Sequence, residues 1–224
     1  MTMKDNSSNM LVSDLVVNDV KDVDAIIFDC DGVLVDITES YDTAINKTVS
    51  YILNDVLDIQ ADNIVTPEIL YGFKSKGGFN DEVAVCYAAI LTSHAAKELG
   101  KSFTEIIKDV IDNSNETGIL SVDKYLTSIN VEITSIKERL NYFGSHETSY
   151  IYTVFDQIFY GAKLYEQIYT KPATIETNGL IEKDKVLINS EIVSALQRKF
   201  RKKNCNSYWQ RKVCFFLFIK RLLR

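Results

Sequence analysis

Two aspartates separated by one residue are the side chains of this sequence best suited to chemistry. Asp29 and Asp31 follow the short apolar run Ala25–Phe28, and Gly32 comes directly after them. Residues two apart on a β-strand point to the same side, so both carboxylates are expected on one face, at the strand's carboxyl end. Two carboxylates at such close quarters repel each other unless a cation or a shared proton compensates. Mg²⁺ suits such a pair because it prefers oxygen ligands and keeps several of its waters.

A carboxylate pair of this kind can also transfer a phosphoryl group. One aspartate can attack phosphorus as a nucleophile and form an aspartyl-phosphate. The neighbouring carboxylic acid can then donate a proton to the leaving oxygen and later activate water. The alternative interpretation is a plain acidic turn after a strand, because short motifs match by chance. The apolar strand before the pair and the segment Gly32–Asp36 after it favour the catalytic interpretation.

The elements that must position this pair are one strand and a long series of helices. The apolar run Ala25–Phe28 predicts a buried strand of a parallel sheet. The spacing of apolar residues predicts helices over 40–57, 81–99, 102–111, 131–142, 148–169 and 185–200. Thr66-Pro67-Glu68 marks a further helix start, Gly100 is expected to end the helix before it, and residues 1–20 are expected to form a loose tail. One strand cannot make a sheet by itself, because a parallel pair needs a crossover to a second strand.

The stretch Ile26–Asp36 resembles motif I of the haloacid dehalogenase superfamily, hhFDxDGhLhD, where h is an apolar residue. The resemblance implies that Asp29 is the nucleophile and that Asp31 is the general acid and base. It also implies that the Asp29 carboxylate and the Asp31 backbone carbonyl bind Mg²⁺. The usual dehalogenase branch lacks the second aspartate, so Asp31 favours phosphoryl transfer. The resemblance therefore implies a magnesium-dependent phosphatase-type hydrolase of a small phosphorylated metabolite.

The same resemblance implies an α/β fold with a Rossmann-like core and a large all-helical cap, similar to the phosphoglycolate-phosphatase-like branch. Residues 21–37 would be the first strand and motif I, residues 38–182 the cap, and residues 183–203 a core helix. Of the core, only this strand and one flanking helix are present. The cap would close over the site and carry the substrate specificity.

A glycine-centred loop, residues 73–80, is the part of the cap most like a substrate site. Its candidate substrate ligands are Lys74, Lys76, Gly77, Gly78 and Asn80. The glycines permit close backbone approach, and the lysines could meet a phosphate or a carboxylate. The asparagine could cap the helix that begins at Asp81. The alternative is an exposed loop without a ligand, because charged loops usually lie at the surface.

Other reactive residues are expected to be structural. His94 lies in an apolar helix, and His146 lies in a turn, exposed and without a visible partner. Cys30 is expected to point away from the aspartates as a small buried hydrophobe. The tyrosines and phenylalanines of residues 142–169 follow helical spacing, and no basic stripe runs between them. They are therefore expected in a core and not in a platform for nucleic acid.

Composition excludes several classes of partner. The net charge of −6 gives no general attraction for nucleic acid or anionic lipid. The four cysteines include no CxxC pair, which predicts a reducing compartment and neither a disulfide framework nor a zinc site. The first ten residues contain no secretory apolar region, and Val213–Ile219 is far shorter than the ~20 residues of a membrane span. We therefore expect a cytoplasmic protein with no nucleic-acid or membrane partner; the oligomeric state stays open.

The end of the sequence departs from the family pattern. The later motifs, a phosphate-binding Thr or Ser, a lysine and an acidic pair, do not occur in residues 183–224. Read one base later, residues 204–209 permit Ile-Ala-Ile-Val-Thr-Gly, which is a buried strand ending in a threonine. The codon of Trp209 followed by any glutamine codon forces that glycine, whereas the other positions are only permissive. We hypothesise a frameshift near residues 201–204, with 204–224 an aberrant tail and the activity impaired; chance is the alternative.

Two other functions stay open at this stage. One is a non-catalytic helical binding module that retains motif I as a relic. The other is a phosphomutase on the same scaffold, which would isomerise a sugar phosphate without releasing phosphate. An Asp29→Asn change separates an enzyme from a module, because it removes the nucleophile and leaves module binding alone. The sequence does not name the substrate, because a fold does not imply a function.

Overall fold

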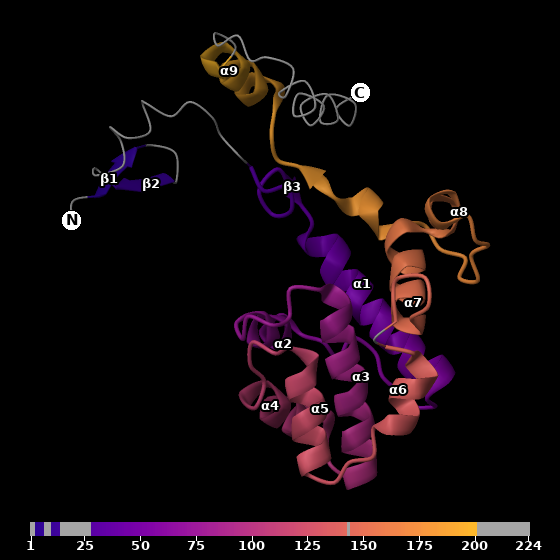
Figure 1. Ribbon diagram of the computed structural model, residues 1–224. Coiled ribbons are helices and arrows are strands. Elements are labelled where there is room, and N and C mark those ends of the chain that lie inside the picture. The colour runs from indigo at the N-terminus through magenta and orange to yellow at the C-terminus, as the bar shows by residue number, and fades with distance from the viewer. Residues whose placement is uncertain (1–2, 7–9, 14–27, 143, 201–224) are drawn as a thin grey trace. The chain divides into compact units, whose positions relative to one another are not determined.

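The chain divides into two compact units in the computed structural model. The residues that the structure describes are 3–6, 10–13, 28–142 and 144–200. Met1–Val35 and Val186–Arg224 make the first unit, and Asp36–Lys185 make the second. The sequence-based division had placed the cap at 38–182. Each unit is described by itself below, and Figure 1 follows the chain through both.

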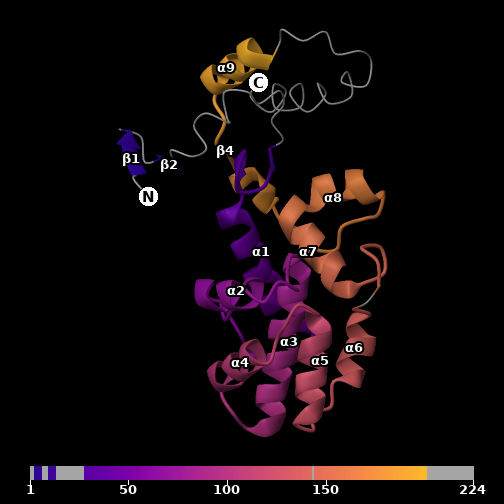
Figure 2. The ribbon, with the colours of Figure 1, turned by 60° about the vertical axis from the view of Figure 1, so that its left-hand side comes forward.

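Helices form the second unit almost entirely. In chain order they are α1 (Thr38–Tyr51), the π-helical turn η2 (Ile52–Val56), α2 (Pro67–Lys74), α3 (Glu82–Leu99), α4 (Phe103–Asp112), α5 (Ile119–Ser128), α6 (Thr134–Leu140), α7 (Tyr150–Tyr160), α8 (Ala162–Tyr169) and the 3₁₀ turn η3 (Leu180–Lys183). α3 packs against α1, α4, α5 and α7, as Figures 1 and 2 let the reader follow. A helix that is apolar on all sides is expected to be buried, and Val83–Ser93 of α3 are buried without a break.

Several helix ends lie where the local sequence predicts them. The Thr66 side chain accepts a hydrogen bond from the Ile69 amide at 3.4 Å, and Pro67 occupies the first turn of α2. Gly100 ends α3 in the left-handed conformation, with φ of 63°. Ser102 and Glu105 form a reciprocal capping box at the start of α4. These predicted boundaries are confirmed, because each depends on residues next to one another in the chain.

Two helix predictions for this unit are wrong in extent, and one further helix was not predicted. The helix expected over 148–169 is broken at Gly161, whose φ is 78° and where an added Cβ would lie 2.4 Å from the Gly179 nitrogen. The helix expected over 131–142 is shorter, because Glu132 accepts the Thr134 amide at its start and Asn141 turns left-handed at its end. The α5 helix was not predicted at all. It begins at Ile119, after the N-cap residue Gly118, which approaches the backbone of another loop.

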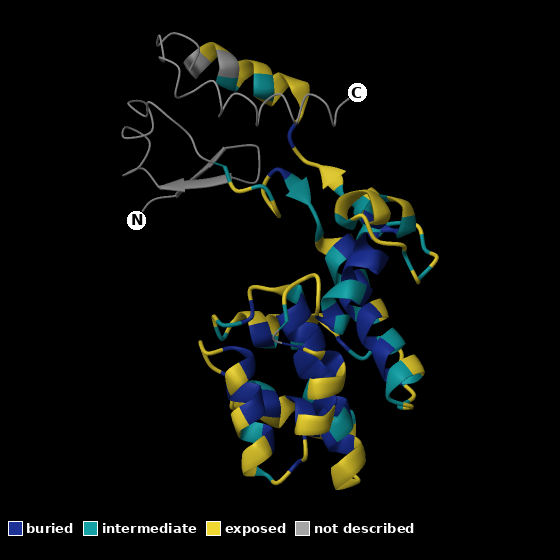
Figure 3. Cartoon of the chain, turned by 45° about the vertical axis from the view of Figure 1, so that its right-hand side comes forward, coloured by how far each residue is buried: buried dark blue, intermediate teal, exposed yellow. Residues whose placement is uncertain are grey.

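The core of the second unit is continuous across its helices (Figure 3). Phe73 and Phe79 are fully buried, with ring centroids 4.7 Å apart, and Tyr87 stacks on Tyr142 at 3.9 Å. The aromatic residues from 142 to 169 contribute Tyr142, Phe155, Phe159 and Tyr165 as buried side chains. The predicted place in a core is confirmed for these four, and Tyr150, Tyr152 and Tyr160 are partly buried against it.

The first unit is small in its described part. β1 (Met3–Asn6) and β2 (Met10–Ser13) pair in antiparallel fashion, so the loose tail expected over residues 1–20 is wrong for these two segments. Strands β3 (Val35–Asp36) and β4 (Lys185–Val186) pair where the chain passes between units. The last element is α9 (Ser190–Phe200).

The helix expected over 185–200 is also shorter, because its first residues continue as strand. The Leu187 amide donates to the Leu34 carbonyl at 2.8 Å. Leu34 and Ile188 are buried together, and the partly buried side chains against them are Phe28, Val35, Val193 and Leu196.

The expected Rossmann-like core is not seen in the part of the chain that the structure describes. Each sheet there has two strands, and the whole is mostly helical. Residues 25–27 of the expected first strand and the segment 201–224 lie outside the described residues. Among the residues that are described, no helix combines the length and the apolar character needed to cross a membrane.

Candidate functional site

The backbone after Asp29 curls into a tight turn. The amides of Val33–Val35 all donate to the Cys30 carbonyl, at 3.4, 2.8 and 3.0 Å, and the Gly32 amide donates to the Val35 carbonyl at 2.8 Å. The φ of Gly32 is 72°, which only glycine adopts readily. Gly32 therefore permits the sharp turn that follows the two aspartates.

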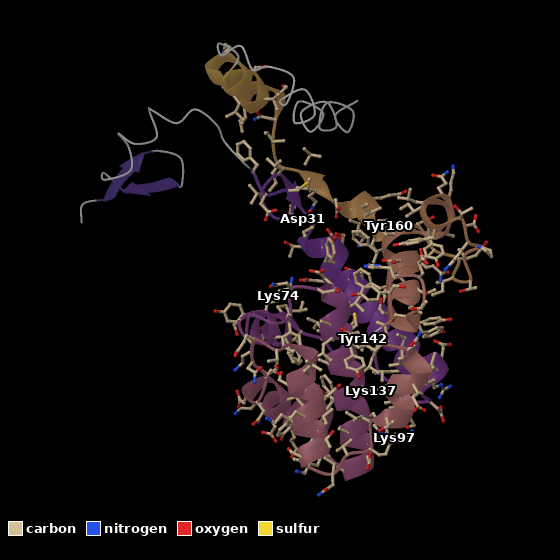
Figure 4. All side chains as sticks on the ribbon, viewed as in Figure 1. Asp31, Lys74, Lys97, Lys137, Tyr142 and Tyr160 are labelled. Carbon is tan, nitrogen blue, oxygen red and sulfur yellow. The ribbon has the colours of Figure 1, made fainter. Side chains whose placement is uncertain are left out.

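Both carboxylates of the motif are exposed beside one thiol. Asp29 accepts the Cys30 amide on its Oδ1 at 2.8 Å, and Asp31, labelled in Figure 4, forms a single bridge with Val35. Partial burial, then the charge of Asp31 and then that of Asp29, raise the pKa of the Cys30 thiol. The expected burial of Cys30 is wrong: the side chain is only partly covered, because the chain turns at this residue and does not continue as a strand.

The donor set at Asp29 and Asp31 fits a hard divalent cation. Mg²⁺ is usually held by one or two carboxylates, with substrate oxygens and waters as its other ligands. Over residues 28–142 and 144–200, no three His, Cys, Asp or Glu side chains gather in a group that could hold a metal. A cation at this turn would therefore depend on waters or substrate oxygens for the rest of its shell.

The lysines of the candidate cap loop are less free than the sequence suggests. Lys74, labelled in Figure 4, forms an ion pair with Glu82, with Nζ and Oε1 3.3 Å apart. Burial raises the pKa of Asp42 on α1, and the positive charge of Lys74 opposes that rise. Lys76 is half-buried, and its amide donates to the Phe73 carbonyl at 3.0 Å. The positive charge of Lys74 is thus balanced by two carboxylates before any ligand arrives.

The two glycines of this loop have different roles. Gly77 has a φ of 83° and open space where a Cβ would stand. An added Cβ at Gly78 would lie 2.4 Å from the Gly118 nitrogen and 2.8 Å from the Glu116 oxygen. Gly78 therefore lets two loops of the protein meet, whereas Gly77 alone keeps the room that a ligand would need.

The N-cap residue of helix α3 is Asp81, whereas the sequence predicted Asn80. Asp81, not Asn80, accepts the Val83 amide, at 2.9 Å, and the Tyr152 hydroxyl donates to the other oxygen of the same carboxylate. The helix begins one residue later than expected, so the capping position moves to Asp81. Asn80 is exposed.

A polar cluster around Asp156 was missed by sequence reasoning. His146 Nδ1 lies 3.3 Å from the buried Asp156 Oδ2, and the Tyr169 hydroxyl donates to the same oxygen at 2.7 Å. Burial raises the pKa of Asp156, while its hydrogen bonds with Tyr169 and His146 oppose the rise. The expectation that His146 has no partner is wrong, because the turn folds back over α7. One signal was available: Asp156 is the only charged residue in the largely apolar segment Ile151–Phe159.

His94 has the structural role that was predicted. Its Nε2 lies 2.8 Å from the Glu132 carbonyl and ties α3 to the segment before α6. It also lines a cavity of about 440 Å³ in the second unit, together with Leu57, Ile59 and Ile136. None of the predicted site residues lines this cavity, so it does not coincide with the candidate chemistry.

The predicted site residues fall into two sets. Asp29 and Asp31 belong to the first unit, and the loop residues 74–80 belong to the second. Within the first set, the turn places both carboxylates near Cys30. Within the second, the contacts run to protein groups on α1, α3 and the loop before α5.

Comparison with known proteins gives one distant likeness. The solved structure of phosphatase Tt82 from Thermococcus thioreducens is similar to this chain, with a TM-score of 0.49 and 22% sequence identity. The match covers 77% of this chain and 58% of that phosphatase, so the chain spans less than two thirds of its length. No protein-family model matches the sequence, and no curated protein matches it.

Proposed function

We propose that this chain carries the nucleophile and the acid–base group of a magnesium-dependent phosphatase-type hydrolase of the haloacid dehalogenase superfamily. The observation that supports it best is the pair of exposed carboxylates, Asp29 and Asp31, on a turn closed by Gly32. The substrate class is a small phosphorylated metabolite.

In this proposal Asp29 attacks the phosphorus of the substrate. A bond forms between its carboxylate oxygen and phosphorus while the bond to the leaving oxygen breaks, and Asp31 donates the proton that the leaving oxygen needs. Asp31 then takes a proton from the water that releases inorganic phosphate and free Asp29. Bound Mg²⁺ would neutralise charge on the phosphoryl oxygens.

The cap loop would contact the rest of the substrate. Lys74, Lys76 and Gly77 are the candidate contacts, and Lys74 would have to exchange Glu82 for a substrate anion. Gly78 has weaker support as a substrate contact, because it is packed against the Gly118 backbone. Asn80 also remains a candidate contact, and its side chain is exposed.

The first experiment is a Mg²⁺ titration followed by the amide NMR signals of residues 29–35. We expect millimolar Mg²⁺ to shift these signals in the unaltered chain and not in Asp29→Asn. Asp62→Asn, a change at an exposed carboxylate of the second unit, serves as the matched control and should respond like the unaltered chain. Equal shifts in Asp29→Asn and the unaltered chain would overturn the metal assignment.

The second experiment concerns turnover. We expect this chain to hydrolyse p-nitrophenyl phosphate at or near the uncatalysed rate, because the later family motifs do not occur in residues 183–224. Sequencing the DNA across codons 195–224 tests the proposed frameshift directly. A frame-restored protein should be active with Mg²⁺, and Asp29→Asn should lower its kcat about a thousandfold or more. Robust turnover by the present chain would contradict the proposed impairment.

A helical binding module is the second candidate function. The observation in its favour is that the second unit has a continuous core of its own. If it is correct, Asp29→Asn changes nothing that the protein does, and the frame-restored protein is inactive. Isomerisation of a sugar phosphate without phosphate release would instead identify a phosphomutase.

A further inference from the structure

Five polar side chains link the end of the candidate substrate loop to two later helices of the second unit. They are Asp81 before α3, His146 in the turn before α7, Tyr152 and Asp156 on α7, and Tyr169 on α8. We call them the Asp81–Tyr169 network. The ring centroids of His146 and Tyr152 are 4.0 Å apart, so the imidazole packs on the ring whose hydroxyl donates to Asp81. The network thus runs without a gap from a buried carboxylate to the first turn of α3.

The network holds the loop at one defined point. Asp81 uses one carboxylate oxygen for the Val83 amide, at 2.9 Å, and the other for the Tyr152 hydroxyl. The next residue, Glu82, holds Lys74 at 3.3 Å. Tyr152 therefore fixes the first turn of α3, and that turn fixes both ends of the loop 75–80.

We propose that Tyr152 is a positioning residue for the loop 75–80, and that the charge on His146 sets how firmly the loop is held. The inference rests on the proposed function, because it is there that Lys74, Lys76 and Gly77 are assigned to the substrate. It adds regulation to that assignment: proton uptake by His146 tightens the loop.

The charges around His146 give the direction of this effect. The titratable or charged groups of the network and of its turn are Asp156 and Tyr152 from α7, Tyr169 from α8, Asp81 before α3, Glu147 from the turn of His146 and Lys171, whose Nζ reaches the Glu147 carbonyl at 3.2 Å. Asp81 and Asp156 repel each other, and Asp156 is buried, with 6% of its side chain exposed. A positive imidazole 3.3 Å from the Asp156 carboxylate offsets that repulsion, whereas a neutral one does not. The network is therefore tighter when His146 is protonated.

His146 is well placed to sense the solution. Its side chain is 58% exposed, although its partner is buried. The sequence contains only two histidines, so the imidazole NMR signals of His94 and His146 are assigned by changing one of them. His94 lies against a backbone carbonyl and a different carboxylate, which makes its titration an internal reference.

The test follows the amide signals of Gly77, Gly78 and Asn80 in the full chain from pH 5 to pH 8. We expect them to change with the same midpoint as the His146 imidazole. In Tyr152→Phe the imidazole should still titrate, but the loop signals should no longer follow it. Amide exchange in the loop should become about fivefold to tenfold faster. Tyr71→Phe, which alters an exposed tyrosine of α2, is the matched control and should behave like the unaltered chain.

Two outcomes would overturn the proposal: loop signals that stay constant through the His146 titration, or loop signals that still follow it in Tyr152→Phe. His146→Gln provides a second test in case Tyr152→Phe does not fold. It should abolish the pH response of the loop signals and leave the fold intact. The experiment uses neither metal nor substrate. A chain that shows no Mg²⁺ response at residues 29–35 would therefore contradict the proposed function alone. Loop signals that do not change with pH would contradict only the proposed role of the Asp81–Tyr169 network.

Discussion

The two units of this protein differ in how much apolar surface they bury. In the second unit the buried side chains form one cluster that runs through α1, α3, α5 and α7. In the described part of the first unit, Leu34 and Ile188 are the buried pair, while Val33, Leu187 and Ile192 are about half exposed. The residues with the clearest chemistry, Asp29 and Asp31, belong to the unit with the smaller core.

The residues that stabilise the fold and the residues proposed to carry the chemistry therefore lie in different units. Burial of apolar area is the main favourable contribution to folding, so the second unit should dominate any cooperative unfolding transition. The turn after Asp29 is held by backbone hydrogen bonds to the Cys30 and Val35 carbonyls and by a small apolar cluster. Substitutions in the two units should therefore have very different consequences for the stability of the whole chain.

The largest expected effect tests this comparison directly. Phe79→Ala removes a fully buried ring that packs against Phe73, and should lower the free energy of unfolding by about 3–5 kcal/mol. Leu34→Ala, in the first unit, should change the same urea transition by less than about 1 kcal/mol, because it belongs to the smaller cluster. Equal losses for the two variants would show that the units unfold as one.

A second pair of variants sharpens the account of the cap loop. Gly78→Ala places a methyl group against the Gly118 backbone and should cost about 2–3 kcal/mol. Gly77→Ala meets open space and has only its positive φ to overcome, so about 1 kcal/mol is expected. Thermal unfolding measures both, and a reversed order would contradict the assigned contact between the two loops.

A third substitution removes one of the caps of the second unit. Asp81→Ala leaves the Val83 amide without its acceptor, and should destabilise the protein by about 1 kcal/mol. Asn80→Ala, at the residue that the sequence favoured as the cap, should cost less than about 0.5 kcal/mol. If Asn80→Ala proves the more costly change, the helix begins one residue earlier than the structure has it.

The smallest expected effect is a pH dependence. Because burial raises the pKa of Asp156, the folded protein holds that proton more tightly than the unfolded chain does. The contribution of protonated Asp156 to stability is fully present below the pKa of the unfolded chain, about 4. It is lost as the pH rises through the pKa of the folded protein. The unaltered chain should thus lose stability relative to Asp156→Asn as the pH rises from about 4 through the raised pKa of the folded state. Parallel stability curves for the two proteins would contradict the burial of a titrating carboxyl.

Local sequence determined much of this protein. The starts of α2 and α4 and the end of α3 lie where capping residues, proline and glycine predict them, because such signals act within one turn of chain. The turn at Gly32 beside two carboxylates follows from the same local rules. Helical spacing also placed Phe155 and Phe159 in a core, because a periodic apolar face must be buried.

Only the tertiary structure decided the rest. The break at Gly161, the N-cap of α5 at Gly118 and the loop contact at Gly78 all arise where backbones distant in the chain approach too closely for a Cβ. The pairing of Lys74 with Glu82 and of His146 with Asp156 depends on where helices and turns meet, not on residue spacing. Such contacts leave no periodic signal in a sequence, because the energy that selects them comes from packing between elements and not from the elements themselves.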